Sequence, residues 1–123
     1  MKLLVDSSTW IDFFRDKNFR LIDLERAIQE NRAMLCPVVW VELWSGVRNK
    51  REESTLLNMR DCCGWLEMDE KVWSICARLR LAARKKGINC PLADVLVVSC
   101  ARRHGAELLH NDKHLSALLK IGL

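Results

Sequence analysis

Apolar and polar residues follow two kinds of pattern along the chain. Short runs of consecutive apolar residues are typical of buried parallel strands, and they predict strands over residues 2–6, 33–36, 64–69 and 106–110. Between these runs, apolar residues recur every three or four positions, which predicts helices over residues 7–18, 19–31, 37–50, 52–62, 70–87, 91–105 and 111–122. Strands that alternate with helices predict an α/β fold, with a parallel sheet covered on both faces.

Length and composition fit one soluble domain. The chain has 123 residues, of which 50% are apolar and 29% charged, so it is long enough for one hydrophobic core and too short for two ordinary domains. Its net charge of +4 is compatible with an anionic partner without requiring one. Because the sequence has no apolar stretch of about 18 residues and no signal peptide after Met1, we expect a cytoplasmic protein without a membrane span.

The six cysteines lie mostly within apolar stretches, where a free thiol behaves as a small hydrophobic group. We therefore expect reduced core residues rather than a disulfide framework. A structural zinc site is disfavoured, because the adjacent pair Cys62-Cys63 has no second half at zinc-ligand spacing.

The apolar run PLADVLVVSCA, residues 91–101, contains a single charged residue, Asp94. An ionised carboxylate that is buried without a partner costs roughly several kcal/mol. The helix N-terminus alone offers about 0.3–1 kcal/mol, which would suffice for an exposed helix, but this helix is apolar nearly all round. We therefore interpret Asp94 as a functional residue that faces a cation.

Three further acids fall at or near the carboxyl ends of the predicted strands, where α/β proteins bind their ligands. Asp6 ends the first strand, Glu42 lies in the second turn of the helix after the second strand, and Asp112 lies two residues past the last strand. Taken alone, Asp6 is also explained as a helix N-cap and Glu42 as part of a solvated helix face. The sequence permits the four acids to meet but does not require it.

If the four carboxylates meet in one crevice, they repel one another, and divalent cations resolve that repulsion. Mg²⁺ and Mn²⁺ prefer oxygen ligands. Ions of this kind activate a water and stabilise the leaving oxygen in phosphodiester hydrolysis. Convergence of the acids would thus indicate a metal-dependent phosphodiesterase.

Four segments occur in one order along the chain: LLVDSSTWIDFF, VVWVELWSGVR, CPLADVLVVSCARRHG and LLHNDKHL. Together they resemble the motifs of the PIN-domain ribonucleases, specifically the VapC toxins of bacterial toxin–antitoxin pairs. The resemblance covers nearly the whole chain, and each motif has its acid in place. It implies a single PIN domain over residues 1–123, with a three-layer α/β/α fold around a short central parallel sheet.

The resemblance also implies a metal-dependent endoribonuclease that uses Mg²⁺ or Mn²⁺ and a metal-activated water. Carried over by motif, its catalytic and metal-binding acids are Asp6, Glu42, Asp94 and Asp112, with Ser8 in a supporting position. The implied substrate is structured RNA, such as transfer RNA, and the expected products carry a 5′-phosphate and a 3′-hydroxyl. The implied partners are a second copy of the chain and a VapB-like antitoxin, whose C-terminal segment covers the active site.

The chain departs from the family pattern at two places. Many relatives have a threonine two residues before the final acid, where this chain has His110. Relatives also often add an edge strand after the last helix, and this chain stops soon after that helix, at Leu123.

Basic, aromatic and histidine residues give weaker signals. Arg48 and Lys113 lie close to the acidic motifs and are candidates for binding RNA phosphates. Trp40 and Trp44 are one helical turn apart, which is typical of a core or a dimer interface. No role is assigned to the histidines, because none has a carboxylate or nucleophile at a characteristic spacing: His104, His110 and His114.

Other classes of protein remain open from the residues alone. A phosphatase with an aspartate nucleophile also begins with a strand that ends in Asp, but it typically has a second Asp where this chain has Ser8. A phosphoacceptor domain places acids at strand ends too, and its surroundings do not require a buried Asp94. A non-catalytic interaction module would use the acids only as helix caps, and a cap gains nothing from an apolar environment.

Overall fold

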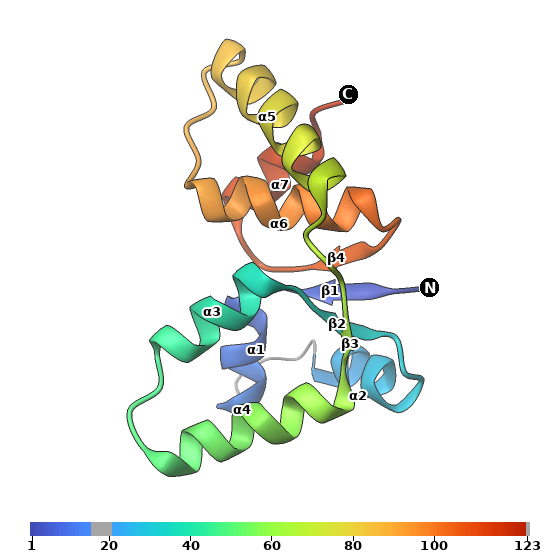
Figure 1. Ribbon diagram of the computed structural model, residues 1–123, viewed down its shortest axis with the longest axis vertical. Coiled ribbons are helices and arrows are strands. Elements are labelled where there is room, and N and C mark those ends of the chain that lie inside the picture. The colour runs from blue at the N-terminus through green and yellow to red at the C-terminus, as the bar shows by residue number, and fades with distance from the viewer. Residues whose placement is uncertain (16–20, 123) are drawn as a thin grey trace.

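A four-stranded parallel sheet forms the centre of the molecule (Figure 1). The structure is a computed structural model that describes residues 1–15 and 21–122. The strands run in the order β3-β2-β1-β4, and they are β1 (Leu3–Val5), β2 (Ala33–Leu35), β3 (Gly64–Trp65) and β4 (Glu107–Leu109). Leu3 pairs with Ala33 on one side and with Glu107 on the other. Because all pairings are parallel, the carboxyl ends of the strands share one edge of the sheet.

Helices lie on both sides of this sheet (Figure 1). One layer contains α5 (Glu70–Lys85), α6 (Leu92–Arg103) and α7 (Lys113–Leu119). The other contains α1 (Ser7–Phe14), α2 (Leu21–Gln29), α3 (Pro37–Ser45) and α4 (Lys50–Cys62). The predicted three-layer α/β/α arrangement is therefore confirmed. Within the described ranges, no helix is long and apolar enough to cross a membrane.

Each predicted helix is present, but several boundaries differ. The helix predicted over residues 37–50 ends at Ser45, and a separate helix begins after Asn49, whose side chain accepts a hydrogen bond from the first turn of α4. Pro91 is the N-cap of α6 and does not open the helix itself. Parts of the first two predicted helices, at residues 16–20, lie outside the described residues.

The strands are shorter than predicted. The run over residues 64–69 forms only the two-residue strand β3, which pairs with Met34 and Leu35 of β2. The last strand covers three residues of the predicted 106–110. No strand follows β4 in the described chain up to residue 122, so β4 is an edge of the sheet there.

The core lies on both sides of the sheet. Leu4, Val5 and Leu35 of the central strands are fully buried. Trp10 of α1 is fully buried below them, and residues 95–101 of α6 are all buried above them. The expectation that α6 is apolar nearly all round is thereby confirmed. Because most of α6 is buried in the core, its first turn has a fixed position relative to the strand ends.

The cysteines form no disulfide in this structure. Four are buried as predicted: Cys36, Cys76, Cys90 and Cys100. Cys62 is exposed and Cys63 is half-buried, because both lie at the end of the polar helix α4, so the core expectation is wrong for Cys62. The Trp40 and Trp44 rings pack edge to face against each other, with centroids 5.7 Å apart. Both rings are partly buried against the core.

Candidate active site

Two neighbouring strands place Asp6 and Asp112 at one edge of the sheet. Asp6 directly follows β1, and its backbone N–H donates a hydrogen bond to the carbonyl of Leu109, the last residue of β4, at 3.0 Å. Asp112 follows Leu109 after a two-residue connection and is the N-cap of α7. The parallel pairing of β1 and β4 therefore brings together residues from opposite ends of the sequence.

The Asp6 side chain does not cap the helix that follows it. Asp6 has the backbone conformation of an N-cap for α1, but its carboxylate accepts no capping hydrogen bond. Instead, the Ser8 hydroxyl donates to Asp6 Oδ2 at 2.7 Å, and Asp6 is only 6% exposed. The carboxylate is thus buried and oriented by Ser8, in the supporting position that the motif implies.

Glu42 reaches the same region from α3. Its Oε1 accepts a hydrogen bond from the Ser7 hydroxyl at 3.3 Å, which joins α3 to the start of α1. Burial raises the pKa of Glu42, and the negative charges of Asp6 and Asp94 raise it further, while the Ser7 hydrogen bond opposes them. Glu42 is half-buried, so the solvated-face interpretation does not hold.

Asp94 lies in the first turn of α6, with 19% of its side chain exposed. Burial raises its pKa, followed by the negative charges of Asp112 and Asp6, and contact with His114 lowers it. The His114 Nδ1 is 3.6 Å from Asp94 Oδ2. Asp94 therefore faces the other acids and one histidine. A residue placed there only to interact with the dipole of its own helix would not need these neighbours.

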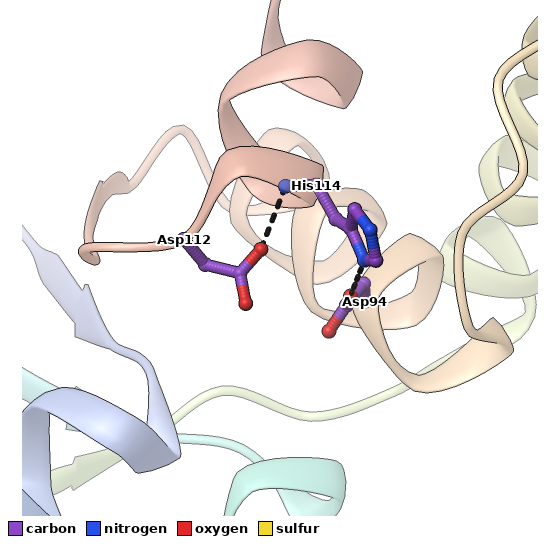
Figure 2. Close-up of side chains that lie close together, drawn as sticks. All are labelled: Asp94, Asp112 and His114. Atoms are coloured by element: carbon purple, nitrogen blue, oxygen red, sulfur yellow. Dashed lines mark hydrogen bonds and ion pairs between the residues drawn. The ribbon is translucent and has the colours of Figure 1, made fainter.

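Asp112 caps α7 with one carboxylate oxygen. Its Oδ1 accepts hydrogen bonds from the backbone N–H groups of His114 at 2.7 Å and Leu115 at 3.4 Å. Figure 2 shows the second oxygen pointing to the same side as the Asp94 carboxylate. Asp112 is thus a helix cap and, with its other oxygen, a potential ligand.

The four acids interact electrostatically, but among the described residues only Asp94, Asp112 and His114 have ligand atoms that all lie within 4.8 Å of one another. Glu42 interacts with Asp6 and Asp94, and Asp94 interacts with Asp6 and Asp112. Among the residues that the structure describes, no lysine or arginine forms an ion pair with any of the four. A set of mutually repelling carboxylates with one histidine and no lysine or arginine paired to it fits a hard divalent cation such as Mg²⁺ or Mn²⁺.

The sequence interpretation missed two polar side chains at this site. Ser7 has no role in the sequence interpretation, and its hydroxyl donates a hydrogen bond to Glu42. His114 was left without a role, although it lies two residues after Asp112 in the first turn of α7. This short separation from Asp112 was the one sequence feature that could have identified His114. Its contact with Asp94 depends on how α6 and α7 pack, so it cannot be predicted from the spacing of residues along the chain.

The weaker basic candidates lie in different surroundings. Arg48 is exposed and forms an ion pair with Glu52, with Nη2 3.4 Å from Oε2. Lys113 lines an open pocket of about 530 Å³ beside Asp112, together with Lys120. His110 also lines this pocket, and its Nδ1 accepts a hydrogen bond from the Asp112 N–H at 3.2 Å, so it holds the backbone of the final motif.

The chain belongs to the PIN domain family, whose profile matches residues 3–120. It is similar to the VapC ribonuclease Mb1587 of Mycobacterium bovis, with 26% identity over 124 residues that cover 97% of this chain and 92% of that protein. The resemblance to VapC-type PIN proteins that the motifs carry is confirmed by these two matches.

Solved structures show the same fold. The VapBC2 structure from Rickettsia felis, bound to a promoter DNA fragment, has a TM-score of 0.80 at 19% identity, covering 95% of this chain and 92% of that one. A toxin–antitoxin complex from Klebsiella pneumoniae has a TM-score of 0.71 at 18% identity, covering 94% and 91%. At this level of identity the likeness defines the architecture, and the chemistry must be argued from the site.

Proposed function

We propose that the protein is a metal-dependent endoribonuclease and the toxin of a toxin–antitoxin pair. The observation that carries the proposal is the group formed by Asp6, Glu42, Asp94 and Asp112, which has no lysine or arginine ion-pair partner among the described residues. The similarity to a VapC ribonuclease supports RNA as the substrate. No specific contact favours a phosphatase, a phosphoacceptor domain or a non-catalytic module.

The acids divide into two tasks in this proposal. Asp6, Asp94 and Asp112 would hold the divalent ion, and Ser8 fixes the direction of the Asp6 carboxylate. When bound, such an ion would offset the carboxylate charge and lower the pKa of a water, which could then lose a proton and attack a phosphodiester. Glu42 has a raised pKa and a hydroxyl neighbour in Ser7, so it is suited to orient the attacking water and accept a proton from it.

Basic residues beside the acids position the RNA backbone. Lys113 and Lys120 line the pocket that adjoins Asp112, where they are placed to bind phosphates of structured RNA, such as transfer RNA. Arg48 lies elsewhere, beside an apolar groove between α1, α3 and α4. We keep Lys113 as a candidate for RNA binding and assign Arg48 to the groove.

The groove suits an antitoxin segment. It has a volume of about 520 Å³, and its lining combines apolar residues with three arginines and the acid Glu52: Ile11, Phe14, Leu43, Val47 and Leu56, with Arg15, Arg48 and Arg51. An amphipathic segment binds a groove of this kind by its apolar face. In this proposal a VapB-like C-terminal segment seats in the groove and continues from it toward the site, because the groove residue Leu43 directly follows Glu42 on α3. We further propose a cytoplasmic homodimer, in which the exposed Val41 of α3 contacts the second copy.

The first test replaces Asp94 by asparagine, which keeps the shape and removes the charge. We expect Asp94→Asn to reduce RNA cleavage by about 100-fold or more, equivalent to roughly 2.7 kcal/mol in the barrier, while the circular dichroism spectrum is unchanged. The matched control is Asp61→Asn on the exposed face of α4, which should cleave at the wild-type rate. Wild-type cleavage by Asp94→Asn, or products with 2′,3′-cyclic phosphates, would contradict the proposal.

A further inference from the structure

We propose that His114 is a nitrogen ligand of the ion held by the acids, and that this ligand makes the site prefer Mn²⁺ over Mg²⁺. The inference rests on the proposed function and decides between its two candidate ions. It concerns a residue that lies within the last motif segment, LLHNDKHL, but is not one of the four acids carried over from the family.

The distance between His114 and Asp94 fits a shared ion. One ligand atom from each of Asp94, Asp112 and His114 lies within 4.8 Å of the other two. The His114 Nδ1 is 3.6 Å from Asp94 Oδ2, which exceeds the usual 2.7–3.2 Å of an N–H···O hydrogen bond. Two atoms that each lie about 2.1 Å from one ion are separated by at most about 4.2 Å. The nitrogen and the carboxylate oxygen are therefore spaced as joint ligands better than as a hydrogen-bonded pair.

The backbone fixes His114 between the two acids. Its N–H donates to Asp112 Oδ1, while its ring faces Asp94 on the neighbouring helix (Figure 2). The far end of α7 is tied to α6 by Arg102, whose Nη2 donates to the carbonyls of Leu118, Leu119 and Ile121. The two helices that carry the three ligands are thus held together at both ends.

The ring can still adjust to an ion, because 54% of the His114 side chain is exposed. A small rotation brings Nδ1 closer to an ion without a core rearrangement. The neutral imidazole is the form that binds metals, and it suits transition-metal ions. Mg²⁺ is bound almost entirely through oxygen, so an added nitrogen benefits Mn²⁺ more.

A competing role for His114 predicts a different change in metal affinity when the side chain is removed. If the protonated ring only neutralises Asp94, it competes with the metal, and its removal leaves metal affinity unchanged or raises it. If the ring is a ligand, its removal lowers Mn²⁺ affinity and has a smaller effect on Mg²⁺. The direction of the change therefore separates the two roles without any measurement of cleavage.

The experiment uses the full chain loaded with Mn²⁺ and pulsed electron paramagnetic resonance, which detects a nitrogen bound directly to the ion. We expect a ¹⁴N coupling in the wild type that is lost in His114→Ala, with the Mn²⁺ Kd raised about tenfold and the Mg²⁺ Kd nearly unchanged. The control is His104→Ala at the opposite end of α6, whose ring bonds the Glu67 carbonyl and which should retain the coupling.

The outcomes distinguish this inference from the proposed function. Mn²⁺ binding without a ¹⁴N coupling in the wild type, and an unchanged Kd in His114→Ala, would overturn the role of His114 while the carboxylate site stands. A wild-type protein that binds no Mn²⁺ would overturn both. Loss of the coupling in His104→Ala as well would show that the signal does not come from His114.

Discussion

At the residue scale, the site depends on side chains that hold the acids in one orientation. Asp6 is the most buried of the four acids, and the exposed Ser8 hydroxyl donates to it at 2.7 Å, a short bond to a charged acceptor. Ser7 makes the corresponding but longer contact with Glu42, at 3.3 Å. Two consecutive hydroxyls at the start of α1 thus orient one carboxylate each.

Removal of the Ser8 hydroxyl should therefore weaken the site without unfolding the protein. We expect Ser8→Ala to lower the RNA cleavage rate by roughly 10- to 100-fold, as is common for groups that orient a metal ligand. Ser8→Thr keeps the hydroxyl, and its methyl group has space because residue 8 is exposed, so it should restore most of the rate. Ser7→Ala should have a smaller effect, and equal rates in wild type and Ser8→Ala would contradict this role.

At the element scale, polar contacts at helix ends join the three helices of one layer, α5, α6 and α7. Asp69 caps α5 by accepting the Val72 N–H at 3.1 Å, and it also binds Arg103, the last residue of α6, with Nη2 2.9 Å from Oδ2. Arg102 bonds the end of α7 instead. The basic pair at residues 102–103 is thus structural, since each arginine joins α6 to a neighbouring helix.

This contact predicts a pH dependence of stability. The Arg103 hydrogen bonds hold the pKa of Asp69 below its ordinary value, so the folded state favours the ionised form. The resulting stabilisation is present above about pH 4, the ordinary pKa of an aspartate, and is lost as the pH falls through the lower folded pKa. Asp69→Asn keeps a helix cap but loses the charge.

Thermal unfolding of wild type and Asp69→Asn, followed by circular dichroism between pH 2 and pH 7, measures this contribution. We expect Asp69→Asn to melt a few degrees lower near neutral pH, and the two curves to converge toward pH 2. A difference in Tm that stays constant across the range would show that the ionised form of Asp69 adds nothing.

At the scale of the whole molecule, the site is a product of topology. The four acids follow β1, lie on α3 and α6, and precede α7, and the parallel sheet brings these points to one edge. The apolar runs predict the strands, so the positions of Asp6 and Asp112 at strand ends follow from the sequence. The burial of Asp94 follows as well, because its helix lacks a polar face.

Other features depend on packing that no local pattern records. The contact between His114 and Asp94 joins two helices, and the Ser7 contact with Glu42 joins α1 to α3. The helix predicted over residues 37–50 was too long, because apolar spacing continues past Ser45 to Val47 although the helix ends before Gly46. The periodicity of apolar residues therefore predicts where helices and strands lie. Tertiary contacts determine where these elements end and which side chains meet at the site.

The central claim is that the carboxylates gather around a divalent ion, and it is tested most directly by the Tm of wild type and Asp94→Asn during a titration with Mn²⁺. In wild type, an ion at 100 times its Kd stabilises the fold by about 2.7 kcal/mol, which raises the Tm by roughly 10 °C. Without metal, Asp94→Asn should melt above wild type because one of four repelling charges is gone, and Mn²⁺ should shift its Tm far less. A wild-type Tm that does not move at millimolar Mn²⁺, or equal shifts in both proteins, would contradict the account.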